Sequence, residues 1–263
     1  MSCPLGKAHV CCTQISNLTV QSGKAVILDN ISLHMHCGEL TAIVGRNGAG
    51  KTTFLKALLG AVPHTGTITF ESENKAPTTK PRFGYVPQQL ALDAGSPVSV
   101  EDLVLASVSR YPVWLPRRKK DKTLVQHVLS RVSAESLAEK KAGELSGGEM
   151  QRVMLALAIH PVPDILLLDE PVSAVDKTGI KLFYDVVSSL RYNYDITILL
   201  ISHDLDIIAR HADRVVLIDR EITAQGTVEE VYNSTPFIET FGHIIAAPPT
   251  RFNNFRKTDA EHI

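Results

Sequence analysis

Apolar and polar positions follow two different patterns along this chain, one typical of buried strands and one typical of helices. Three short runs consist mostly of Leu, Ile, Val and Ala, at residues 40–44, 165–169 and 196–202. Runs without polar alternation are typical of strands buried on both faces, as in a parallel sheet. Residues 53–59 and 205–211 follow two of these runs with helical spacing. This order of elements predicts an α/β core.

The chain before residue 40 is different. Residues 14–20 and 26–35 are β-like and are joined through residues 22–24, Ser-Gly-Lys, which predicts an antiparallel hairpin. Further strands are predicted at residues 66–70, 82–86 and 215–219. We therefore expect a mixed sheet together with an antiparallel β subdomain.

The middle of the chain predicts helices. Helix-like segments cover residues 100–109, 122–132 and 135–141, and prolines and a basic run at 117–120 separate them. We expect a helical subdomain at about residues 89–158, inserted into the α/β core. A last short helix should follow the capping pair Thr227 and Glu230. Residues 1–245 then form a single domain and residues 246–263 a polar tail.

Composition narrows the class of protein. The 263 residues are 44% hydrophobic and 21% charged, which is ordinary for a globular chain, and the net charge is −1. This balance gives no electrostatic footprint for wrapping a nucleic acid. No stretch approaches 18 consecutive apolar residues and the start lacks an apolar signal region, so we expect the chain in the cytoplasm.

A phosphate-binding loop follows the first buried run. The residues that fit the pattern G-x-x-x-x-G-K-[ST] are Gly45, Arg46, Asn47, Gly48, Ala49, Gly50, Lys51 and Thr52, with Thr53 beginning the helix behind them. The glycines let successive N–H groups point at one spot, where the helix N-terminus favours an anion. Lys51 would reach the β- and γ-phosphates of a nucleotide, and Thr52 would place its hydroxyl on Mg²⁺.

Two further groups of residues point to the same chemistry. A second glycine loop, residues 145–149 (Leu-Ser-Gly-Gly-Glu), also leads into a helix. Asp169 and Glu170 end a buried strand, where an unpaired charge is expensive, so this pair suggests a metal ligand and a proton-handling group. His203 follows the next apolar run.

Together these segments resemble the ATP-binding subunits of ABC transporters over nearly the whole chain. The resemblance adds four motifs to the phosphate loop and the carboxylates: Gln88 (Q-loop), Ser146 with Gly147 and Gly148 (signature loop), residues 173–176 (D-loop, ending at Asp176) and His203 (switch histidine). It implies the P-loop NTPase form of the predicted α/β fold, with the inserted helical subdomain. The signature ends in Glu149, where the family usually has Gln.

The family's roles carry over residue by residue. Asp169 and Thr52 would hold Mg²⁺, and Gln88 would touch the metal or the attacking water. Glu170 would orient and deprotonate that water, with His203 contacting the γ-phosphate. The resemblance also implies that Ser146, Gly147, Gly148 and Asp176 serve the nucleotide of a second copy. Two subunits would sandwich two ATP molecules and separate after hydrolysis.

The resemblance is strongest to the subunits that drive import of zinc, manganese or iron ions. The residues that carry it are 173–176, 183–185 and 201–205. It implies a transmembrane permease as partner, an extracytoplasmic metal-binding protein in the same system, and a place at the cytoplasmic face of the membrane. Leu90, Leu92, Val98 and Trp114 could line the groove for the permease. An ABC motor for another substrate, an exporter motor and a soluble ABC ATPase remain alternatives.

The cysteines invite a metal site of their own. Cys3, Cys11, Cys12 and Cys37 are interleaved with His9, His34 and His36. There is no C-x-x-C pair, and Cys37 should point away from the face that His34 and His36 share on a strand. From the sequence alone, small core or surface thiols are the simpler interpretation.

One departure from the family generates a prediction. The family usually stacks an aromatic residue on adenine, and Ser22 occupies the aligned position, with no Phe, Tyr or Trp before Phe54. We therefore expect the base to be held weakly and ATP to be little preferred over GTP, with His9 or an aliphatic side chain as the alternative contact. Because stacking on a base is worth roughly 1–3 kcal/mol, Ser22→Tyr should tighten ATP binding about 5- to 150-fold. Titration with both nucleotides checks this. Equal affinity of wild type and variant, with strong selection against GTP, would contradict it.

Overall fold

The structure is a computed structural model, and it describes residues 10–72, 81–88, 96–108, 118–172 and 175–243. Within these residues no helix is both long and apolar enough to cross a membrane.

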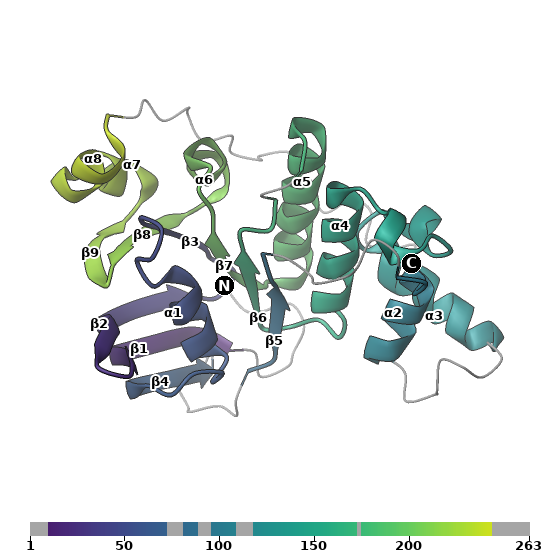
Figure 1. Ribbon diagram of the computed structural model, residues 1–263, viewed down its shortest axis with the longest axis horizontal. Coiled ribbons are helices and arrows are strands. Elements are labelled where there is room, and N and C mark those ends of the chain that lie inside the picture. Colours follow the sequence, from purple (N-terminus) through teal and green to yellow (C-terminus); the bar gives the residue numbers. More distant parts are fainter. Residues whose placement is uncertain (1–9, 73–80, 89–95, 109–117, 173–174, 244–263) are drawn as a thin grey trace.

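A sheet of six strands forms the centre of the fold (Figure 1). In spatial order its strands are β5 (Phe83–Val86), β6 (Ile165–Asp169), β7 (Thr197–Ile201), β3 (Leu40–Val44), β8 (Arg214–Asp219) and β9 (Glu221–Gly226). The first five run parallel and β9 is antiparallel to β8. The sheet is therefore mixed, as predicted, and the carboxyl ends of its parallel strands meet along one edge.

A second, antiparallel sheet packs beside it. Its strands lie in the order β2 (Ala25–His36), β1 (Val10–Ser22) and β4 (Thr65–Ser72). Helix α1 (Lys51–Leu58) lies between the two sheets, and its Phe54 and Leu55 are fully buried. The predicted hairpin is confirmed, with both strands longer than the sequence indicated.

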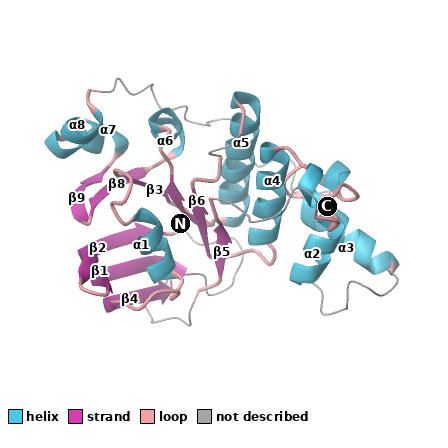
Figure 2. Cartoon of the chain, in the orientation of Figure 1, coloured by secondary structure: helices cyan, strands magenta, loops and turns pink. Residues whose placement is uncertain are grey.

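Apart from α1, the helices form two groups, and Figure 2 shows α2 and α3 of one group and α7 and α8 of the other at opposite ends of the molecule. One group contains α2 (Val100–Val108), α3 (Lys119–Ser130), the 3₁₀ helices η1 (Glu135–Leu137) and η2 (Ala142–Glu144), α4 (Gly147–Ala158) and α5 (Lys177–Tyr194). The other contains α6 (Leu205–His211), α7 (Val228–Tyr232) and α8 (Thr235–Phe241).

Alternation along the buried strands divides the core. Leu166 and Leu168 of β6 pack with the helices around α4 and α5, whereas Ile165 and Leu167 of the same strand pack with α1 and the antiparallel sheet. A third cluster joins β3 and β8 to α6, α7 and α8. The continuous apolar runs thus serve two different layers, which is why they lack polar alternation.

Two predicted elements differ from the structure. The prediction of a helix at residues 135–141 is wrong, because only the single 3₁₀ turn of η1, residues 135–137, forms there. The chain instead pairs with the segment before α2, because Val100 N donates to Lys140 O and Ala142 N to Val98 O. The helix capped by Thr227 and Glu230 is confirmed as α7, but α8 follows it. Sequence patterning did not single out α5 or β9.

Several predictions concern residues outside the described part of the chain. Leu90, Leu92 and Trp114 of the expected permease groove lie there, as do two residues of the D-loop (173–174) and the tail at 246–263. Val98 is described and is half-buried. The boundaries expected for the helical subdomain stay a prediction.

Candidate functional site

The phosphate loop connects β3 to α1, and its glycines are held where side chains do not fit. Gly45 has φ 155°, and a Cβ there would collide with the carbonyl oxygen of Ile218 on β8. Gly50 caps α1 with φ 99°, and its missing Cβ makes room for Leu28 of β2. Both sheets therefore press on the loop, and glycine allows the approach.

The loop opens into a cavity of about 460 Å³. Six predicted residues line its floor: Asn47, Gly48, Gly50, Lys51, Thr52 and Thr53. Gln88, Glu170 and His203 line it as well, and they come from the loops that follow β5, β6 and β7. Since these strands are neighbours and parallel, their carboxyl ends bring the three side chains together.

Lys51 is a buried charge in this cavity. Its Nζ donates to Gly45 O at 2.9 Å and to Arg46 O at 3.1 Å, and the residue is 7% exposed. Burial lowers the pKa of Lys51, and the nearby Glu170 and Asp169 partly oppose that shift. The ammonium is thus held by neutral carbonyls, ready for a stronger anionic partner. Gly45, Arg46 and Ala49 of the predicted loop are not among the residues that line the cavity, and the Ala49 side chain is buried.

Asp169 is a carboxylate buried at the end of β6, with 2% of its surface exposed. Thr52 Oγ1 donates to its Oδ1 at 3.2 Å, and the Tyr85 hydroxyl donates to its Oδ2 at 3.3 Å. Burial raises the pKa of Asp169, and Glu170 adds to that rise. Burial and the neighbouring Asp169 also raise the pKa of Tyr85 to about 12, so the phenol stays a donor. A buried carboxylate beside a hydroxyl fits the hard oxygen ligands that Mg²⁺ prefers.

Glu170 is clamped between two other predicted residues. Gln88 Nε2 donates to its Oε2 at 2.7 Å, and His203 Nε2 lies 2.7 Å from its Oε1. Its backbone has φ 49°, an uncommon conformation for a residue with a side chain. Its N–H donates to Ile201 O of β7 at 3.0 Å. Backbone strain of this kind clusters at functional sites.

The signature loop lies elsewhere. None of Ser146, Gly147, Gly148 and Asp176 is among the residues that line the cavity. Ser146 caps α4, and Asp176 caps α5 by accepting a hydrogen bond from Gly179 N at 3.1 Å. Gly148 and Gly179 approach closely, so the two helix starts lie side by side, apart from α1 (Figure 1).

Glu149 explains how the signature loop is held. Its carboxylate accepts from Ser146 N at 2.9 Å and from Lys140 Nζ at 2.8 Å, and its own N–H donates to Ser146 Oγ at 3.3 Å. The hydrogen bonds from Lys140 and Ser146 lower the pKa of Glu149 to about 2. The residue that departs from the family pattern is therefore part of a capping box.

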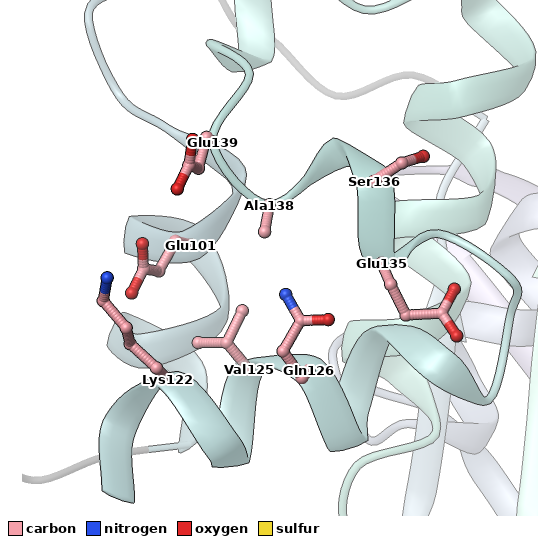
Figure 3. Close-up of a pocket in the computed structure, with 8 residues that line it drawn as sticks. All are labelled: Glu101, Lys122, Val125, Gln126, Glu135, Ser136, Ala138 and Glu139. Atoms are coloured by element: carbon pink, nitrogen blue, oxygen red, sulfur yellow. The ribbon is translucent and has the colours of Figure 1, made fainter. Parts of the chain in front are cut away.

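A second cavity, of about 350 Å³, lies among α2, α3 and η1 (Figure 3). Glu101, Glu135 and Glu139 line it together with Lys122. It has no glycine loop and none of the predicted site residues, so it is not the nucleotide cavity.

Sequence reasoning missed two residues of the site. Tyr85 holds Asp169, but only the adjacency of β5 and β6 reveals this. Ile27 of β2 lines the cavity as an aliphatic side chain five residues after the aligned Ser22. The missing aromatic residue indicated that an aliphatic side chain could take this place, but it did not indicate which one.

Comparison with known proteins gives three consistent findings. A family model described as ABC transporter matches residues 28–173, more than half of the chain. The zinc import ATP-binding protein ZnuC of Chromohalobacter salexigens is 36% identical over 229 residues, covering 87% of this chain and 88% of the relative. ZnuC of Photorhabdus laumondii is 36% identical over 230 residues, covering 87% and 83%. The crystal structure of a nucleotide-free ATP-binding cassette from an ABC transporter has a TM-score of 0.74 at 24% identity, covering 88% of this chain and 98% of that one.

The capping box generates a pH prediction. Because the pKa of Glu149 is depressed to about 2 in the folded chain, its contribution is present above its unfolded value and is lost as the pH falls toward 2. Glu149→Gln should lower the free energy of unfolding by about 1 kcal/mol at neutral pH, since the Lys140 partner is half-exposed and screened. The difference should shrink as the pH is lowered from about 5 to about 3. Urea unfolding at each pH measures it.

Glu144→Gln is the matched control. Glu144 pairs with Lys141 at 3.6 Å, and both side chains are mostly exposed, at 61% and 59%. It should change stability little at any pH. A Glu149→Gln deficit that stays constant across this pH range would show that the carboxylate charge is not responsible.

Proposed function

The chain belongs to the ABC transporter family, and on that premise we propose that it is the ATP-hydrolysing subunit of a membrane transporter that imports a metal ion. Two copies would act together, and their joining and separation would drive a permease. The observation that carries the catalytic part is the Glu170 carboxylate, clamped between Gln88 and His203 in the cavity that Lys51 lines.

Glu170 is the proposed general base. Its two oxygens would turn from Gln88 and His203 toward a water in line with the γ-phosphate, and would take a proton from that water. His203 would then contact the γ-phosphate. Gln88 would touch the metal or the water. The distances of 2.7 Å to both neighbours support this arrangement, because all three side chains already reach one point.

Phosphate binding falls to the loop. Gly45, Arg46, Asn47, Gly48, Ala49, Gly50 and Thr53 would present backbone groups to the phosphates, and Lys51 would exchange its carbonyl partners for them. Thr52 and Asp169 would hold Mg²⁺, with Gln88 at its edge. When bound, this ion neutralises charge that develops on the phosphate oxygens. The raised pKa of Asp169 supports the assignment, since a cation relieves a buried carboxylate.

The second copy accounts for the signature loop. Ser146, Gly147, Gly148 and Asp176 lie outside the cavity of their own chain, so we place them against the nucleotide of the partner subunit. The N-terminus of α4 would then direct its free N–H groups at the γ-phosphate. ATP becomes an interface ligand, and its hydrolysis opens the dimer.

The transported substrate is proposed from the relatives. Two of them are named as zinc import ATP-binding proteins, and they share 36% of aligned residues with this chain. Zinc is therefore the first candidate, with manganese and iron as alternatives. The partners would be a transmembrane permease and an extracytoplasmic metal-binding protein, which places the chain at the cytoplasmic face of the membrane. A different substrate or a soluble ABC ATPase remains the second candidate.

The base contact is proposed for Ile27. Its side chain lines the cavity from β2, in the sheet where the family usually places its aromatic residue. An aliphatic side chain stabilises a purine only through the apolar surface that the contact buries. It therefore selects weakly between adenine and guanine.

The mechanism predicts a trapped dimer. Glu170→Gln keeps the size and a hydrogen bond to Gln88 or His203 but removes the base, so ATP should bind and not turn over. The variant should elute as a dimer on a sizing column in ATP and as a monomer in ADP. Lys51→Ala, which loses the buried ammonium, should bind no nucleotide and stay monomeric.

Ser146→Arg tests the shared site in the same assay. It should bind ATP but block hydrolysis, because its side chain would obstruct the partner's nucleotide. A monomeric Glu170→Gln protein with full turnover would contradict the catalytic assignment. Normal turnover in Ser146→Arg would contradict the shared site.

The substrate is tested by uptake. Cells that lack this chain should lose uptake of radioactive zinc, and a plasmid copy of the wild type should restore it while Glu170→Gln should not. Manganese and iron are measured in parallel. Unchanged uptake of all three ions would contradict the proposal that the substrate is a metal ion. The proposed ATPase activity would not be affected, because the dimer assay tests it separately.

A further inference from the structure

Three metal-ligating side chains meet on the antiparallel sheet, far from the motifs of the nucleotide site. The register of β1 and β2 places Cys12 directly opposite His36, and His34 lies two residues along the same strand. The sulfur of Cys12 and one ring nitrogen of each histidine all lie within 4.8 Å of one another. The two imidazole rings meet edge to face, with centroids 4.4 Å apart.

The strand pattern explains why these three side chains share a face. Leu33 and Met35 of β2 are buried in the core, so His34 and His36 between and beyond them point outward. Cys12 occupies the outward position that pairs with His36, and such pairs have close Cβ atoms. Cys37, by contrast, donates to Asp195 Oδ2 at 3.2 Å and lies outside the cluster. The expectation that Cys37 would not join the histidines is therefore confirmed, and Cys12 is the thiol that does.

The three ligand atoms, one sulfur and two nitrogens, determine which metal ion the cluster would prefer. One thiolate and two imidazoles are the ligands that tetrahedral Zn²⁺ takes, at about 2.3 Å for sulfur and about 2.1 Å for nitrogen. Ligand atoms around such an ion are roughly 3.5 Å apart, so this cluster needs only small side-chain rotations to close. Both histidines are exposed, which leaves them free to rotate.

A tetrahedral ion needs a fourth ligand, and the neighbouring strand β4 carries a carboxylate on the same face of the sheet. Cys12 pairs on its other side with Glu71 of β4, so the two side chains project from the same face of the sheet, although the carboxylate is not within the 4.8 Å cluster. Water or this carboxylate would complete the coordination. A thiolate and a nearby carboxylate also balance the charge of a divalent cation.

We propose that Cys12, His34 and His36 form a binding site for a thiophilic divalent metal ion, with Zn²⁺ preferred. The site is separate from the Mg²⁺ position beside Thr52 and Asp169. Ile27 of β2 lines the nucleotide cavity, and His36 is nine residues further along the strand, roughly 30 Å away. The proposal does not depend on what the transporter carries.

The test uses the full chain, reduced, stripped of metal and free of nucleotide. Titration with Co²⁺ should give one ion per chain, with the visible bands of a tetrahedral site and a near-ultraviolet band from sulfur-to-cobalt charge transfer. Zn²⁺ should displace the Co²⁺, because zinc binds such ligands more tightly. Cys12→Ser should remove the charge-transfer band, and His34→Gln and His36→Gln should each weaken Zn²⁺ binding by at least about tenfold.

Cys37→Ser and His64→Gln are the matched controls, because they change the same residue types outside the cluster. Both should bind Zn²⁺ as the wild type does. Circular dichroism and binding of a fluorescent ATP analogue should be unchanged in all variants, since the three side chains lie on the outside of the sheet. A charge-transfer band that persists in Cys12→Ser, or Zn²⁺ affinity unaffected by the histidine changes, would overturn the assignment.

Discussion

The fold is organised around opposite charges that are buried at one edge of a sheet without touching each other. Lys51 is held by two backbone carbonyls and Asp169 by two hydroxyl groups, and both side chains are almost fully buried. Burial shifts both pKa values toward the neutral form, so each group would gain from a charged partner. A nucleotide bound with Mg²⁺ would supply both partners at once, as proposed above. Parallel strands make this possible, because β3 and β6 deliver the two residues to the same edge.

Much of this edge could be predicted from the sequence, because its signals are local. The residues of the phosphate loop form one continuous stretch, 45–52, and β3, β6 and α6 lie where the apolar runs predicted them. What could not be predicted depends on pairing. Tyr85 meets Asp169 only because β5 lies next to β6, and Cys12 meets His36 only in the register that β1 and β2 adopt, past several irregularities. The helix expected at residues 135–141 failed for the same reason, since a distant segment took its hydrogen bonds.

The two departures from the family pattern, Glu149 in the signature loop and the missing aromatic residue, can each be related to neighbouring residues in the structure. Glu149 stands where the family usually has a neutral Gln. Its carboxylate is paired with the Lys140 ammonium and accepts a hydrogen bond from Ser146 N at the start of α4. The missing aromatic residue leaves Ile27 as the side chain that the antiparallel sheet offers to the cavity. In both places the side chains concerned lie on elements whose position the fold already sets. The overall fold matches that of a nucleotide-free ATP-binding cassette with a TM-score of 0.74 at 24% identity.

The left-handed backbone of Glu170 has a consequence for how this chain can change. Glycine is the residue that adopts φ near 49° without steric cost, so Glu170→Gly would relax the turn after β6. The same exchange deletes the carboxylate that Gln88 and His203 hold. The stability of the folded chain and the proposed role of Glu170 as general base therefore favour different residues at this position.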